Sequence, residues 1–256
     1  MKRYLVAFGL AAILTAPVFA ASGRRPAPAT AFPGAPAEYT QFSPAELSRG
    51  FLALAFGSDL RLGSRPKGIR RFDGAVRVHV VAGGSVARSE AYRRILGEFA
   101  QKTPNLNMSV VENLSAANVV VRLIDEKDFA AAMEAAYGRI TSRAFVKQTN
   151  PQCMTSLKSQ TDGKVIRADV FIIVDKGDRV FLDCAYHETL HAVGLSNHDN
   201  LNPWTTLNQK RMVGYLSVYD RALLALLYDP RIRPGMTRAE ADRILPRLIK
   251  DLNLHQ

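Results

Sequence analysis

One stretch of thirteen residues, His187–Asp199, constrains this chain more than any other, because three of its five histidines lie there. It begins as H-E-x-x-H, with His187, Glu188 and His191. Residues four apart share one face of a helix, so both imidazoles can reach one metal ion. The Glu188 carboxylate would lie beside the water that the metal activates, where it can take up a proton and pass it to a leaving amine. Gly194 follows, and a glycine can turn the chain sharply out of a helix. The stretch therefore predicts a zinc site on a buried helix, with Glu188 as general base.

The longer pattern H-E-x-x-H-x-x-G-x-x-H resembles the metzincin zinc peptidases over its first eight residues. In that family the third ligand lies three residues after the glycine, where this chain has Asn197, a poor ligand for zinc. His198 comes one residue later, so we expect the set His187, His191 and His198, completed through a turn one residue longer. Asp199, or a ligand elsewhere in the chain, remains an alternative for the third position.

The resemblance to metzincins also implies an α+β fold, with a twisted mixed β-sheet, a zinc-binding active-site helix and C-terminal helices. It implies a tight methionine turn beneath the metal. We place that turn at 205–208, which puts Leu207 under the site, and Met212 is a second candidate. Asp220 is interpreted as the third residue of a helix capped by Ser217. The alternative for Asp220 is a zinc ligand of the type found on a later helix in other zincins.

The two cysteines, Cys153 and Cys184, predict one disulfide, because an exported protein meets an oxidising compartment. Cys184 also lies three residues before His187 and could share its helix face. A thiolate ligand for the metal is therefore the alternative interpretation of this cysteine.

The first twenty residues predict a secretory signal peptide. Lys2 and Arg3 precede the apolar run 4–14, and small residues lead to a cleavage site after Ala20. The run is too short for a stable membrane span. We therefore expect a soluble periplasmic or secreted protein.

Residues 21–41 are rich in alanine and proline and predict a flexible or extended tether. Residues 42–256 are expected to form a single metzincin-like domain. Within it, hydrophobic periodicity and capping residues predict helices at 43–57, 85–101, 125–137, 180–193, 216–228 and 237–252. Alternating and β-branched runs predict strands at 76–81, 108–111, 118–124, 155–158 and 165–174.

The excess of basic over acidic side chains indicates which kinds of partner the protein could bind. Without Lys2 and Arg3, the remaining 32 basic side chains exceed the 23 acidic ones by nine. Such an excess favours adhesion to an acidic envelope surface. The positive charges are scattered and no nucleic-acid-binding motif occurs, so we expect no nucleic-acid partner, and a monomer.

A second resemblance covers nearly all of residues 42–250. The run LLYDPRIRPGM at 226–236, the following TRAE, the GFLALAFGSD stretch near residue 50, the cysteines and HAVGLSN are similar to a proteobacterial family known as domain of unknown function 2927. That resemblance implies an exported protein and no particular activity.

The function we expect is a zinc-dependent metallopeptidase acting on an unidentified peptide or protein. Two alternatives remain: a non-catalytic envelope scaffold on a metzincin-like fold, and a zinc hydrolase directed at peptidoglycan cross-links.

Overall fold

The computed structural model describes residues 23–57, 68–83, 85–139 and 151–252. The predicted signal peptide, 1–20, lies outside these residues. The described helices are α1 (Pro44–Ala55), α2 (Val86–Lys102), α3 (Glu126–Tyr137), α5 (Asp178–Ala192), α6 (Val218–Leu227) and α7 (Arg238–Asp251), with a 3-10 turn at Leu114–Ala116. None of them is long and apolar enough to cross a membrane.

Five strands form one mixed sheet in the order β4-β3-β5-β7-β6. They are β3 (Val76–Ala82), β4 (Met108–Val110), β5 (Val119–Ile124), β6 (Cys153–Ser159) and β7 (Val165–Ile173). The pairs β3–β4, β3–β5 and β5–β7 are parallel, and β6 pairs antiparallel with β7 as a hairpin. The α+β class is confirmed, and β6 becomes an edge strand.

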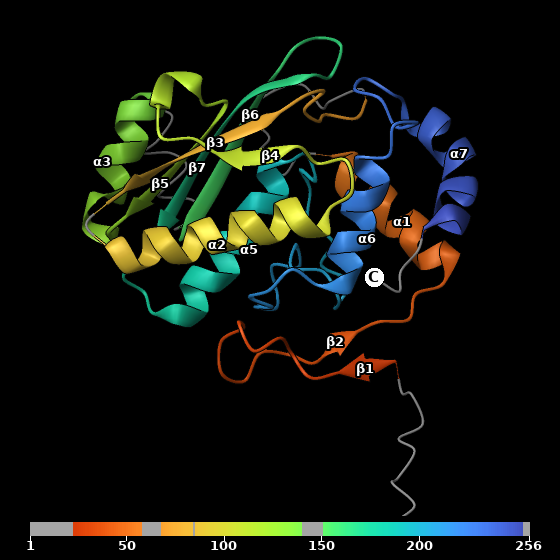
Figure 1. Cartoon of the computed structure of the whole chain (residues 1–256), viewed down its shortest axis with the longest axis horizontal. Helices are drawn as coiled ribbons and strands as arrows, with labels where there is room; N and C mark the ends of the chain where they lie inside the picture. The colour runs from red at the N-terminus through yellow and green to blue at the C-terminus, as the bar shows by residue number, and fades with distance from the viewer. Residues whose placement is uncertain (1–22, 58–67, 84, 140–150, 253–256) are drawn as a thin grey trace, which may run out of the picture.

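Helices cover both faces of this sheet (Figure 1). Helices α2 and α5 lie on one face, and α3 lies on the other. Alternation along β7 explains the two layers, since Val170 and Ile172 face the large core while Phe171 and Ile173 face α3. Helices α1, α6 and α7 pack together at one end of the molecule.

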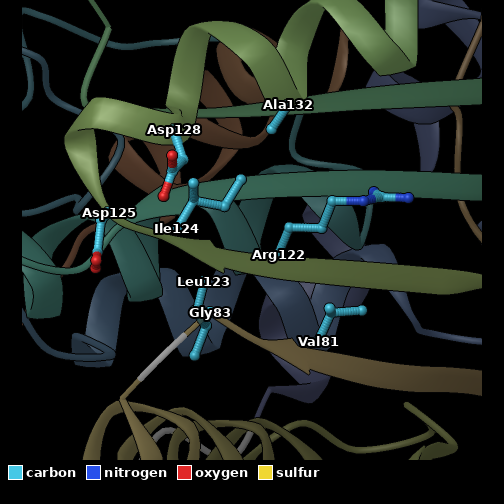
Figure 2. Close-up of a pocket in the computed structure, with 8 residues that line it drawn as sticks. All are labelled: Val81, Gly83, Arg122, Leu123, Ile124, Asp125, Asp128 and Ala132. Atoms are coloured by element: carbon cyan, nitrogen blue, oxygen red, sulfur yellow. The ribbon is translucent and has the colours of Figure 1, made fainter.

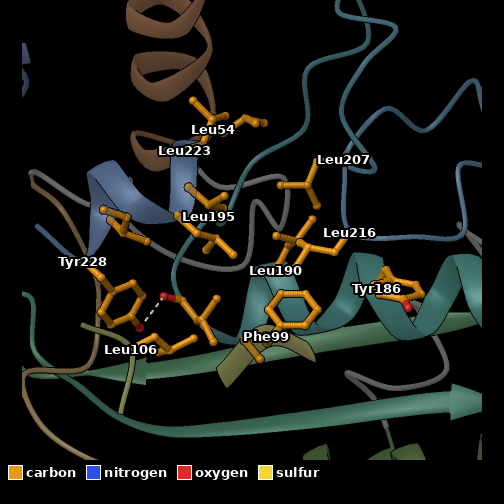
Figure 3. Close-up of a cluster of buried hydrophobic side chains, with 14 of the residues drawn as sticks. Leu54, Phe99, Leu106, Tyr186, Leu190, Leu195, Leu207, Leu216, Leu223 and Tyr228 are labelled. Carbon is orange, nitrogen blue, oxygen red and sulfur yellow. Dashed lines mark hydrogen bonds between the residues drawn. The ribbon is translucent and has the colours of Figure 1, made fainter. Parts of the chain in front are cut away.

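The large core surrounds the C-terminal end of α5 (Figure 3). Leu190 and Leu195, on either side of the turn that ends this helix, are fully buried beside side chains of α6 and its preceding segment. The Tyr228 hydroxyl donates to the carbonyl oxygen of Val193 at 2.9 Å and ties the end of α5 to the end of α6. The end of α5 is therefore held rigidly where the predicted site begins.

Side chains cap the starts of three helices. Ser43 and Glu46 form a capping box at α1, and Thr237 and Glu240 form one at α7. Ser217 caps α6 by accepting a hydrogen bond from the backbone N–H of Asp220. The boundaries of these helices are thus determined locally.

The N-terminal segment differs from the predicted tether. Two short strands, β1 (Arg24–Arg25) and β2 (Glu38–Tyr39), pair antiparallel and lie against the domain. Glu38 is only 5% exposed, and its carboxylate accepts hydrogen bonds from Arg25 Nε at 2.8 Å and from the Val218 N–H, at the start of α6, at 2.7 Å. Composition favours an extended chain here, but this buried carboxylate and its partners dock the segment.

Candidate metal centre

Helix α5 carries the first two histidines on one face. His187 and His191 are four residues apart, and their Nε2 atoms lie 3.1 Å from each other. Other side chains of the helix, among them Phe181, Ala185 and Leu190, are buried in the core on either side of the histidines. The helix is therefore oriented by its buried side chains, and both imidazoles are directed to one point.

A Schellman turn ends α5 and redirects the chain. The Gly194 N–H donates to the His191 carbonyl at 3.0 Å, and the Leu195 N–H donates to the Leu190 carbonyl at 3.1 Å. Gly194 has a φ of +117°, and a Cβ there would lie 2.3 Å from the backbone oxygen of Arg70. Both the backbone conformation and the close approach therefore require glycine, as its position in the motif predicts.

The turn brings His198 to the other two histidines. Its Nε2 lies 2.8 Å from that of His187 and 3.1 Å from that of His191. Among the described residues these three side chains form the one group that could hold a metal ion. The set named from sequence is thus brought together in space.

The residues on either side of His198 have other partners. Asn197 donates from Nδ2 to the Ala53 carbonyl of α1 at 2.9 Å, so it is directed away from the cluster. Asp199 accepts from the Leu201 N–H at 3.2 Å and lies outside the histidine group. Because Asn197 is attached to α1, the next residue, His198, reaches the cluster through a turn that is one residue longer than in the metzincin pattern.

Two of the imidazoles are oriented by backbone carbonyls. His187 Nδ1 lies 2.9 Å from the oxygen of Thr206, and His191 Nδ1 lies 2.6 Å from that of Leu195. A carbonyl oxygen only accepts, so each Nδ1 carries the hydrogen and each Nε2 presents a lone pair to the cluster. Carbonyl partners of this kind fix the tautomer and ring orientation of metal-binding histidines.

The imidazoles are also electrically neutral at pH 7. Burial lowers the pKa of His187 to about 4, that of His191 to about 3 and that of His198 to about 4. A neutral imidazole is the form that binds a metal ion. Tetrahedral coordination with zinc–nitrogen bonds of about 2.05 Å places ligand nitrogens about 3.3 Å apart, close to the observed separations.

Glu188 follows His187 directly on α5 and is only 4% exposed. Its Oε2 atom has no hydrogen-bond partner among the described residues. Burial raises the pKa of the carboxyl to about 8, and the neighbouring Thr155 of β6 opposes that rise. A buried carboxyl with a free oxygen is chemically suited to accept or release a proton.

The segment predicted as the turn beneath the site lies against His187 through its backbone. The contact comes from the Thr206 carbonyl, and Leu207 is fully buried in the large core. Asp220 is not in the histidine group and instead holds this segment, accepting from Thr205 Oγ1 and the Thr206 N–H. Sequence reasoning missed the Thr206 contact because a backbone carbonyl leaves no signal in the residue pattern.

The two cysteines form the predicted disulfide, with a Cα–Cα distance of 5.8 Å. The bridge joins Cys153, at the start of β6, to Cys184 of α5. Cys184 is therefore not a thiolate ligand, since its sulfur is already bonded. The bridge and the 3.0 Å hydrogen bond from the Thr155 hydroxyl to the Glu188 carbonyl fix the edge strand against the helix.

A separate surface pocket lies on the α3 side of the sheet (Figure 2). It opens where β3 and β5 end and holds none of the predicted site residues. Its lining comprises Val81, Gly83, Arg122, Leu123, Ile124, Asp125, Asp128 and Ala132. The histidine cluster and this pocket are therefore distinct features.

Comparison with known proteins identifies a family. A family model described as "protein of unknown function (DUF2927)" matches residues 44–247, and the chain belongs to that family. Neither the curated proteins nor the solved structures contain a match to this chain.

Proposed function

We propose that this member of the DUF2927 family is an exported, metzincin-like zinc peptidase, with His187, His191 and His198 as metal ligands and Glu188 as general base. The observation that carries the proposal is the convergence of three Nε2 atoms at separations of 2.8–3.1 Å. His187 and His191 hold their hydrogens on Nδ1, against backbone carbonyls, so the lone pairs of their Nε2 atoms are directed into the small space that His198 completes. A divalent metal ion bound there would be held by three neutral imidazole nitrogens.

Zinc held there would supply a Lewis acid and lower the pKa of a water molecule. The protein supplies the remaining functions. Thr206 and Leu195 orient two ligands through their carbonyls, and the core excludes bulk water from the inner side of α5. Glu188, whose Oε2 has no hydrogen-bond partner among the described residues, would take a proton and return it to the leaving nitrogen of a cleaved amide.

A peptide substrate is favoured by the strand next to the helix. β6 is at the edge of the sheet, and its outer side pairs with no described strand. An extended peptide can add to such an edge through backbone hydrogen bonds. The disulfide holds this strand against α5 close to Glu188, which would bring a bound amide bond to the metal centre.

Metal content of the mature protein tests the proposal. The protein is purified without metal-affinity resin, and zinc is counted per chain by elemental mass spectrometry in wild type, His198→Ala and His79→Ala. His79 is a matched control, because it lies on β3 outside the cluster and bonds the Val111 carbonyl. One zinc in wild type and in His79→Ala, lost in His198→Ala, is the expected result.

Glu188→Gln then separates binding from chemistry. The variant should keep its zinc and lose hydrolysis of a peptide library, since the amide cannot act as a base. Cleavage of cross-linked peptidoglycan fragments in place of linear peptides would redirect the substrate to the cell wall. Absence of zinc after reconstitution would overturn the peptidase proposal and favour a binding scaffold.

A further inference from the structure

Asp220 occupies an unusual place for a carboxylate. It lies on the first turn of α6 and its side chain is fully buried, with 0% exposure. Burying a carboxylate is costly unless it is well hydrogen-bonded. Capping of α6 needs only the Ser217 hydroxyl and the Asp220 backbone, so helix capping alone does not account for a fully buried acid.

Three donors converge on the Asp220 carboxylate. Thr205 Oγ1 donates to Oδ1 at 2.6 Å, and both the Thr206 N–H, at 2.9 Å, and Ser217 Oγ, at 2.8 Å, donate to Oδ2. Every partner here is a donor, so these hydrogen bonds favour the ionised carboxylate, although burial raises the pKa of the carboxyl above its usual value. Two of the three donors belong to the segment that contacts His187.

The segment is fixed on both sides of Thr206. The peptide before Thr206 is held directly, because its N–H donates to Asp220. The peptide after it is held indirectly, because the Leu207 N–H donates to Thr205 Oγ1 at 3.1 Å and that hydroxyl donates to Asp220. This second peptide contains the Thr206 carbonyl that lies 2.9 Å from His187 Nδ1. Its orientation therefore depends on the buried carboxylate.

We propose that Asp220 is a positioning residue for His187, acting through Thr205 and Thr206 to aim one carbonyl at the imidazole. The carbonyl selects the tautomer with hydrogen on Nδ1 and keeps Nε2 directed at the cluster. The effect of this role on metal binding depends on the proposed metal centre, because a misdirected His187 would weaken the binding of the metal. The geometry of the relay itself does not require a metal.

Zinc affinity measured by competition with a chelator tests the consequence. Asp220→Asn should raise the zinc dissociation constant about 10- to 100-fold, the range found when outer partners of metal ligands are removed. Glu38→Gln is the matched control. Glu38 is a second buried carboxylate at the start of α6, where it accepts from the Val218 N–H at 2.7 Å, but no link from it to an imidazole is found among the described residues. The control should change zinc affinity less than about threefold.

Thr205 provides a second pair of variants, should the Asp220 variant fail to fold. Thr205→Val removes the hydroxyl that joins the Leu207 N–H to the carboxylate, and Thr205→Ser restores it. We expect weaker zinc binding in the valine variant and affinity within about twofold of wild type in the serine variant. Equal loss in both variants would point to packing and overturn the relay.

A metal-free measurement separates this inference from the proposed function. Long-range proton–nitrogen NMR of the apo protein should assign His187 to the Nδ1–H tautomer, and Asp220→Asn should populate the other one. If wild type binds no zinc but this tautomer shift occurs, the relay stands and the peptidase proposal fails. If wild type binds zinc while Asp220→Asn leaves tautomer and affinity unchanged, the relay is wrong and the metal centre stands.

Discussion

Removal of the disulfide should destabilise the protein by an amount that the loop length predicts. Cys153 and Cys184 are 31 residues apart. Closing a loop of about that size lowers the entropy of the unfolded chain by about 12 cal/mol/K, which stabilises the folded state by about 3.7 kcal/mol at 25 °C. Because the bridge joins β6 to α5, we expect the Cys153→Ala/Cys184→Ala variant to lose about this amount of unfolding free energy.

Urea unfolding followed by the fluorescence of Trp204, the single tryptophan, measures the loss. With an m value of about 3 kcal/mol/M, the midpoint should fall by about 1.2 M. Trp204 is a useful reporter because its ring stacks on Tyr39, with centroids 4.5 Å apart. Unfolding therefore separates this pair and changes the environment of the indole.

Cys153→Ala alone is the control for packing. It breaks the same bridge but keeps the buried Cys184 side chain. Its loss of unfolding free energy should therefore agree with that of the double variant within about 1 kcal/mol. The folded double variant should also retain its zinc, because no cysteine is in the proposed ligand set. A loss below about 1 kcal/mol in both variants would refute the loop-closure argument.

Three further predictions concern single residues. Gly194→Ala should lower the free energy of unfolding by about 2–4 kcal/mol and weaken zinc binding, since its Cβ would lie 2.3 Å from a backbone oxygen. Gly34→Ala, in a turn at φ +80° with open space around it, should lower the free energy of unfolding by only about 1 kcal/mol in urea unfolding. Glu38→Gln should lower stability by about 1–3 kcal/mol and shift the tryptophan emission to longer wavelength, because the N-terminal segment loses a charged partner at the start of α6; an unchanged spectrum would show that the segment docks without this carboxylate. Burial raises the pKa of Asp183 from 3.8 to about 6, and hydrogen bonds from the Val213 and Gly214 N–H groups oppose this rise. The favourable contribution of the protonated carboxyl to the free energy of unfolding is therefore complete below pH 4 and is lost as the pH rises through 6. In metal-free protein, Asp183→Asn should therefore gain up to about 3 kcal/mol relative to wild type between pH 4 and pH 7, and parallel pH profiles would contradict the shift.

Local sequence signals explain most of the secondary structure and part of the site. The face shared by His187 and His191 follows from four-residue spacing on one helix. The capping boxes at Ser43 and Thr237 satisfy helix ends with side chains three residues away. Alternation along β7 predicted a strand, and pairing confirmed it. Each of these features is determined by residues that are close together in the chain, so the geometry of the local backbone is sufficient to predict it.

Contacts between distant segments decided the rest. Whether His198 or Asp199 joins the cluster depends on Asn197 bonding a carbonyl 144 residues earlier, on α1. The N-terminal segment has the composition of a tether, yet Glu38 bonds the start of α6, 180 residues later. Composition and residue spacing do not predict such pairings, because a buried charge or amide is stabilised by whichever partner the fold brings near. The sequence alone thus determined which side chains could form the site, and the tertiary structure decided which of them meet.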